Sequence, residues 1–140
     1  MRVVADTNTV VSGLLWAGPP RELINAARAK RITLYSSVTL IAEFAEVIAR
    51  EKFSTRIRSA GVLAPGIVAD YAQLVRIVAP ADIPPAVTGD PDDDQVLACA
   101  LAAEADLIVS GDKRLRNLKA YHGISIVTAA EAVKRLPPGT

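Results

Sequence analysis

The chain has 140 residues, with 16 Lys or Arg against 15 Asp or Glu and a formal net charge of +1. This length suits one domain over 1–140, and the balanced charge excludes a global electrostatic attraction to nucleic acid or to an anionic membrane. Cys99 is the only cysteine, which excludes an intramolecular disulfide and a cysteine-rich zinc site and is typical of a reducing compartment.

The N-terminal part predicts two buried strands with a helix between them. Residues 2–5 form a β-branched run, which predicts a parallel strand that ends at Asp6 in a polar loop over 7–9. Two prolines open a helix over 19–30, because proline is favoured at the first helical position. A second strand is expected over 32–35.

The middle of the chain predicts mainly helices. The serines at 36 and 37 offer a cap for a helix whose apolar residues recur with helical spacing as far as Ile48. Residues 53–79 predict a short basic helix, a break at 61–66, and a further helix or strand that reaches Val78.

The C-terminal part returns to a regular alternation of helices and strands. Prolines at 80, 84 and 85 predict an irregular connection, after which Asp90 and Pro91 suit the N-cap and first position of an alanine-rich helix to Glu104. The elements expected after it are a strand over 107–109, a turn over 110–112, a strand over 124–127 and a helix over 129–136.

This alternation predicts an α/β fold in which a mainly parallel sheet is covered by helices on both faces. Sheets of this kind place their functional sites outside the carboxyl ends of the strands, and Asp6 and Asp112 both follow predicted strands. Each of these two acids, taken alone, is equally well explained as a turn former.

We expect a cytoplasmic protein. The apolar run at residues 3–5 is broken at once by Asp6, which no signal peptide resembles. No apolar stretch approaches the roughly 18 residues that a membrane-spanning helix requires.

Acidic residues gather in the segment Asp90-Pro91-Asp92-Asp93-Asp94. The helix dipole favours anions in a first turn, so capping alone explains two or three of them. Acids this close together also repel one another and raise one another's pKa unless a cation neutralises them. Helix capping and a bound divalent cation are both consistent with the segment.

Glu43 adds an acid beside the apolar stripe of the helix after the second strand, where an exposed helix glutamate is the alternative. Mg²⁺ and Mn²⁺ take oxygen ligands, so Asp and Glu without histidine suit them better than zinc. The only histidine, His122, is expected in a solvated loop.

Four segments in order, spread over nearly the whole chain, resemble the PIN-domain ribonucleases, in particular the VapC-like toxins of bacterial and archaeal toxin–antitoxin pairs. They are Val3–Asn8, Leu40–Phe44, Asp90–Leu97 and Ala105–Asp112. They are similar to the family's opening strand with Asp-Thr-Asn, its acid-bearing helix, its Asp-Pro-x-Asp segment and its Ser-Gly-Asp turn. The resemblance implies a three-layer α/β/α fold around a central, mainly parallel sheet.

The resemblance also assigns the site. The catalytic and metal-binding acids that it implies are Asp6, Glu43, Asp93 and Asp112. The supporting polar residues are Asn8, Asp90, Asp94 and Ser110. Asp94 takes the place of Asp93 if the helix begins one residue later.

The activity implied is hydrolysis of RNA phosphodiester bonds by a Mg²⁺- or Mn²⁺-dependent endoribonuclease, the toxin of a type II toxin–antitoxin pair. The implied partners are an RNA substrate, a cognate antitoxin and a second copy in a homodimer. Basic residues able to contact the RNA backbone are Lys113, Arg114, Arg116 and Lys119, with Arg50, Lys52, Arg56 and Arg58 as a second patch. A solvated helix face is the alternative for each of them.

Two other functions stay open. The run Asp6-Thr7-Asn8-Thr9-Val10 is similar to the nucleophile motif of haloacid-dehalogenase phosphatases, although that motif normally has a second Asp where this chain has Asn8. A non-catalytic binding or receiver-like module would use the acids only to cap helices and to hold a structural ion. A Rossmann dinucleotide site is disfavoured, since no G-x-G-x-x-G follows the first strand.

Overall fold

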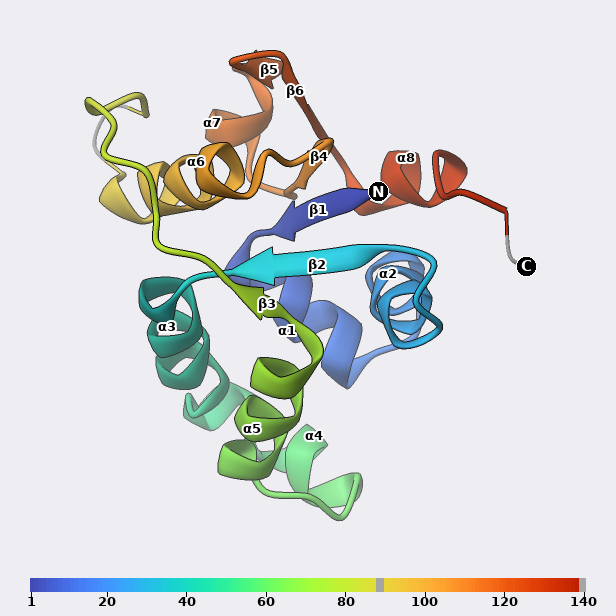
Figure 1. Ribbon diagram of the computed structural model, residues 1–140. Helices are drawn as coiled ribbons and strands as arrows, with labels where there is room; N and C mark the ends of the chain where they lie inside the picture. The colour runs from blue at the N-terminus through green and yellow to red at the C-terminus, as the bar shows by residue number, and fades with distance from the viewer. Residues whose placement is uncertain (88–89, 139–140) are drawn as a thin grey trace.

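A computed structural model describes residues 1–87 and 90–138 of the chain. The strands form a six-stranded sheet in the order β3-β2-β1-β4-β6-β5, with helices on both of its faces (Figure 1). The strands are β1 (Arg2–Ala5), β2 (Thr33–Ser36), β3 (Arg76–Ile77), β4 (Leu107–Val109), β5 (Ala120–Tyr121) and β6 (Ile124–Val127). Only β5 runs antiparallel to its neighbour, so the predicted α/β fold with a mainly parallel sheet is confirmed.

The helices divide into two layers because successive strand residues point to opposite faces. Val3 and Val4 are both fully buried, but Val3 belongs to the larger apolar cluster and Val4 to the smaller one. The larger cluster packs α1 (Thr7–Leu15), α2 (Pro19–Arg28), α3 (Val38–Ile48), α4 (Ser54–Ser59), α5 (Ala64–Leu74) and α8 (Ala129–Lys134) on the sheet. The smaller cluster packs α6 (Pro91–Ala103) and α7 (Lys113–Arg116) on the other face.

Side-chain caps mark where several helices begin. Ser37 accepts a hydrogen bond from the backbone N–H of Leu40 at the start of α3, and Thr128 accepts one from Glu131 at the start of α8. Capping satisfies backbone donors that have no partner inside the helix. A single turn of 3₁₀ helix (Glu51–Phe53) connects α3 to α4.

Several predicted boundaries were wrong. Residues 7–9 form the first turn of α1 rather than a polar loop, because the Asp6 carboxylate caps that helix. The second strand lies one residue later than predicted, at 33–36, and Ser37, one of the two serines expected to offer a cap, caps α3. The expected break at 61–66 is shorter, because α5 already begins at Ala64.

The C-terminal region also differs from the prediction. The last helix ends at Lys134 instead of residue 136. Strand β5 was not predicted; it pairs with β6 through a tight turn at His122 and Gly123, both of which have positive φ angles. Asp112 begins a short helix, α7, where only a turn was expected.

Strands β1 and β4 are neighbours in register, with Ala5 opposite Val109. Asp6 and Ser110 therefore leave the sheet at the same level, at the carboxyl ends of adjacent parallel strands. Such strand ends are where α/β proteins build their sites. Among the described residues, no helix is long and apolar enough to cross a membrane.

The packing of α1 on α2 leaves no room for a side chain at Gly13. A Cβ there would lie 2.7 Å from the backbone oxygen of Pro20 and 2.8 Å from Ile24 Cγ1. We predict that Gly13→Ala lowers the free energy of unfolding by about 1–3 kcal/mol, since the helices must move apart. Urea denaturation measures it.

Gly66→Ala is the matched control, because Gly66 is also helical and its Cβ would meet nothing within 4 Å. This variant should be as stable as wild type, or more stable by up to about 1 kcal/mol from helix propensity. Equal unfolding midpoints for Gly13→Ala and wild type would contradict the packing described here.

Candidate functional site

Asp6 is fixed at the junction of β1 and α1. Its carboxylate accepts hydrogen bonds from the backbone N–H of Thr9, at 3.0 Å, and from the Ser110 hydroxyl. Its own backbone N–H donates to the carbonyl of Val109 in β4. Asp6 is buried, with 7% of its surface exposed, and its hydrogen bond to Val109 ties its position to both strands.

Ser110 connects Asp6 to Asp112. It is fully buried, and its hydroxyl oxygen also accepts a hydrogen bond from the backbone N–H of Asp112, at 2.9 Å. The Asp112 carboxylate accepts from the N–H of Arg114 and so caps α7. The Ser110 hydroxyl thereby holds Asp112 through the backbone N–H of Asp112 and holds Asp6 through the Asp6 carboxylate.

The third group of acids comes from the first turn of α6. Asp90 is the N-cap, and its carboxylate accepts from the N–H groups of Asp92 and Asp93 at 3.1 and 3.2 Å. Asp93 is buried, with 8% of its surface exposed. Among the described residues, its Oδ2 atom has no hydrogen-bond partner. A buried carboxylate oxygen without a partner is costly unless a ligand supplies one.

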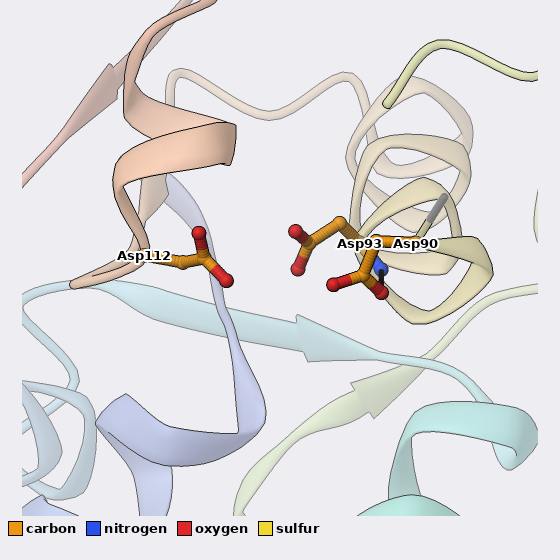
Figure 2. Close-up of side chains that lie close together, drawn as sticks. All are labelled: Asp90, Asp93 and Asp112. Carbon is orange, nitrogen blue, oxygen red and sulfur yellow. Dashed lines mark hydrogen bonds between the residues drawn. The ribbon is translucent and has the colours of Figure 1, made fainter. Parts of the chain in front are cut away.

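These side chains face one another across a small space. One carboxylate oxygen from each of Asp90, Asp93 and Asp112 lies within 4.8 Å of the other two, and Figure 2 shows Asp112 facing the two acids of α6. The adjoining cavity has a volume of about 40 Å³, room for about three waters. Its lining residues are Asp6, Thr7, Asn8, Glu43, Asp92, Asp93, Val96 and Asp112.

All four acids assigned as catalytic, Asp6, Glu43, Asp93 and Asp112, therefore line one cavity. They come from the end of β1, from α3, from α6 and from the turn after β4. Asn8 lies on the exposed start of α1 and also lines the cavity.

Three residues that sequence reasoning did not place in the site also line the cavity: Thr7, Asp92 and the apolar Val96. Asp92 was assigned only a place in the first turn of α6. The polarity of Thr7 beside Asp6 was visible in the sequence, but its helical position was not predicted.

Asp94 has a structural role instead. Its carboxylate accepts from the backbone N–H groups of Ala86 and Val87, at 3.1 and 2.8 Å, and ties the proline-rich connection to α6. It does not line the acidic cavity, whereas Asp93 does. Of these two acids in the first turn of α6, the geometry therefore favours Asp93 as the one that belongs to the candidate site.

The concentration of negative charge alters how the acids ionise. Burial, followed by the charges of Asp112 and Asp90, raises the pKa of Asp93 to about 7. Burial also raises the pKa of Glu43, with smaller contributions from Asp92 and Asp6, while a hydrogen bond from Thr7 lowers it. Both carboxylates hold protons more tightly than usual, as expected for acids that share a site without a cation.

Arg114 provides a positive charge at this cluster. One guanidinium nitrogen lies 2.9 Å from Asp90 Oδ2, and Nε lies 3.8 Å from Asp112 Oδ1. Its side chain is 58% exposed, so it can leave these partners. Arg116, on the same short helix, donates to the carbonyl of Gly111, and Lys113 begins that helix.

The second basic patch lies in the 3₁₀ turn and α4, apart from these elements. Its four residues, Arg50, Lys52, Arg56 and Arg58, are all exposed. Arg56 donates to the carbonyl of Leu15 and thus also holds α4 against the end of α1. None of the four lines the acidic cavity.

The donor set suits a hard divalent cation. It consists of carboxylate oxygens, which Mg²⁺ and Mn²⁺ prefer, and it includes the partnerless Asp93 Oδ2. Among the described residues, Asp90, Asp93 and Asp112 each offer an oxygen close enough to the others to share such an ion, and Asp6 and Glu43 line the cavity beside them. Asp90 fits less well, because one oxygen already accepts two backbone N–H groups and the other faces Arg114.

We predict that Asp93→Asn stabilises the metal-free protein at pH 8. The native state holds a proton on Asp93 up to about pH 7, whereas the ordinary pKa of an aspartate side chain is 3.8. The wild type therefore loses stability as the pH rises from about 4 to about 7 and stays at the lower level above. Neutral Asn removes this loss.

Thermal denaturation in EDTA should show the melting temperature of Asp93→Asn at or above that of wild type at pH 8, by about 3 °C if the gain is about 1 kcal/mol. Mg²⁺ should then raise the melting temperature of wild type more than that of the variant. A variant that melts well below wild type in EDTA at pH 8 would show that Asp93 serves the fold.

We predict opposite effects of Arg114→Ala on stability and on metal affinity. Loss of the guanidinium leaves Asp90 and Asp112 without their cation, so the metal-free protein should lose up to about 1 kcal/mol at low salt. Affinity for Mn²⁺, measured by calorimetry, should increase about 3- to 10-fold. The control Lys113→Ala removes a charge from the same helix and should change affinity less. Weaker Mn²⁺ binding by Arg114→Ala would contradict this.

Comparison with known proteins agrees with this geometry. The model of the family described as "PIN domain" matches residues 2–114, which include all five acids that line the cavity. No curated protein matches the chain, and no solved structure does. Proteins of this family are generally metal-dependent nucleases, and the acidic cluster suits that chemistry. The chain belongs to the PIN-domain family.

Proposed function

We propose that this chain is a Mg²⁺- or Mn²⁺-dependent endoribonuclease. The observation that supports this most directly is the convergence of Asp6, Glu43, Asp93 and Asp112 on one small cavity, with a buried oxygen of Asp93 left without a partner. Carboxylates in such an array hold metal and need not transfer protons themselves. When bound, the metal would lower the pKa of a water and stabilise negative charge on the phosphate.

The chain's own residues prepare the site for that chemistry. Ser110 and the N–H of Thr9 orient the Asp6 carboxylate, and the N–H of Arg114 orients that of Asp112. Each oxygen of Asp6 accepts one of these hydrogen bonds and keeps a second lone pair, and on Asp112 it is Oδ1 that accepts the N–H of Arg114. The acids are therefore positioned before any ion or substrate arrives.

The RNA backbone needs positive charge close to the acids, because the whole chain carries only +1. Lys113, Arg114 and Arg116 on α7 follow Asp112 directly and supply it. We propose that Arg114 moves from Asp90 to a phosphate of the substrate, since its side chain is largely exposed.

The biological role that we propose is that of a VapC-like toxin, cytoplasmic and homodimeric, that a cognate antitoxin holds inactive. The support is the resemblance of the four sequence segments to that subgroup. An antitoxin would suit the site if it brought a basic side chain to the uncompensated acids. No specific observation favours the phosphatase alternative. The family model that matches the chain is that of the PIN domain, not that of a phosphatase.

The experiment is a cleavage assay on single-stranded and structured RNA with Mg²⁺, Mn²⁺ or EDTA. We predict that Asp6→Asn, Glu43→Gln and Asp93→Asn each reduce cleavage at least about 100-fold, because a lost ligand weakens the site that activates water. Glu46→Gln is the matched control, an exposed glutamate on the same helix as Glu43, and should keep full activity. RNA cleavage that persists in EDTA, or equal losses in Glu43→Gln and Glu46→Gln, would refute the proposal.

A further inference from the structure

A larger groove lies directly beside the acidic cavity. Its volume is about 340 Å³, and it shares Asn8 and Asp112 with the cavity. Its other walls include Ser12 of α1, Pro20 of α2, Gly111 of the turn after β4 and Ala129 of α8. A ligand in the groove would therefore lie beside Asn8 and Asp112, which also line the acidic cavity.

The chemistry of the groove differs from that of the cavity. The described residues that line the groove include one carboxylate, that of Asp112, and no Lys or Arg, so the groove does not suit a second phosphate. Pro20 and Ala129 offer apolar surface, while the amide of Asn8 and the hydroxyl of Ser12 can each donate and accept hydrogen bonds. A small number of such polar groups among apolar walls is typical of a site for a neutral, hydrogen-bonding ligand.

The covalent structure of RNA determines which neutral group can lie there. A phosphate held at the acids carries a nucleoside on each side, and each nucleoside must lie beside it. Sequence-specific proteins read unpaired RNA bases through contacts to their faces and edges. A volume of about 340 Å³ is at the lower end of ligand pockets and suits one such unit.

We propose that this groove binds the nucleoside next to the cleaved phosphate of a single-stranded RNA substrate, and that Asn8 and Ser12 read its base or ribose. The inference rests on the proposed nuclease function and adds a specificity subsite to it. The enzyme should accordingly prefer certain bases at the nucleotide that lies in the groove.

Gly111 allows a direct test. A Cβ at Gly111 would meet nothing within 4 Å, and its backbone does not require glycine, so Gly111→Leu should fold and fill part of the groove. Gly66→Leu is the matched control, since a Cβ at Gly66 also meets nothing within 4 Å and Gly66 lies in α5, outside the groove.

Binding can be measured without metal or catalysis. Adenosine, cytidine and uridine are titrated into the ¹⁵N-labelled protein in EDTA, and inorganic phosphate serves as a second ligand. We expect nucleoside-dependent shifts at the amides of Asn8, Ser12, Gly111 and Ala129, and at least about 5-fold weaker binding by Gly111→Leu with no change in Gly66→Leu. Equal shifts with phosphate, shifts elsewhere, or unchanged binding by Gly111→Leu would overturn the proposal.

Cleavage kinetics separate this proposal from the nuclease function. Gly111→Leu should raise KM for RNA at least about 10-fold, change kcat less than about 3-fold, and alter the base preference beside the cleaved bond. If wild type cleaves RNA and Gly111→Leu matches it in KM and preference, the groove proposal fails alone. If wild type cleaves no RNA while nucleosides bind at the groove, the nuclease proposal fails and the binding site stands.

Discussion

The repulsion among carboxylates held around one small cavity is the constraint on which this structure depends. Burial and neighbouring charges raise the pKa of Asp93 and Glu43, so the metal-free site is electrostatically unfavourable. The fold tolerates this cost because a sheet with two packed apolar clusters supports the residues around it. Arg114 compensates part of the charge, and a divalent cation would compensate more.

Helix capping and metal binding are not alternatives here. Asp6 caps α1, Asp90 caps α6 and Asp112 caps α7, so the acids that stabilise helix starts also surround the site. These acids therefore lie at the N-termini of α1, α6 and α7. The same hydrogen bonds that start the helices keep Asp6 and Asp112 from rotating away from the cavity.

Sequence patterns predicted the sheet class and most elements, because β-branched runs and helical spacing are strong where burial is complete. They missed α1, which begins at the Asp6 cap, and they missed β5 and α7, which are short and depend on local turns at Gly123 and Asp112. The sequence predicted that Asp6 and Asp112 converge, because each follows the end of a predicted parallel strand. That β1 and β4 are neighbours was visible only in the structure. The resemblance already preferred Asp93 to Asp94 for the site, but the role of Asp94 in holding the proline-rich connection was beyond the sequence, because its hydrogen bonds with Ala86 and Val87 determine that role.

Anomalous diffraction from a crystal of the protein with Mn²⁺ would test the central claim most directly. The account predicts a manganese peak in the cavity bounded by Asp6, Asp93 and Asp112, in contact with the buried oxygen of Asp93 that lacks a partner. A crystal whose cavity shows no manganese peak at saturating Mn²⁺, with these carboxylates still facing one another, would contradict it.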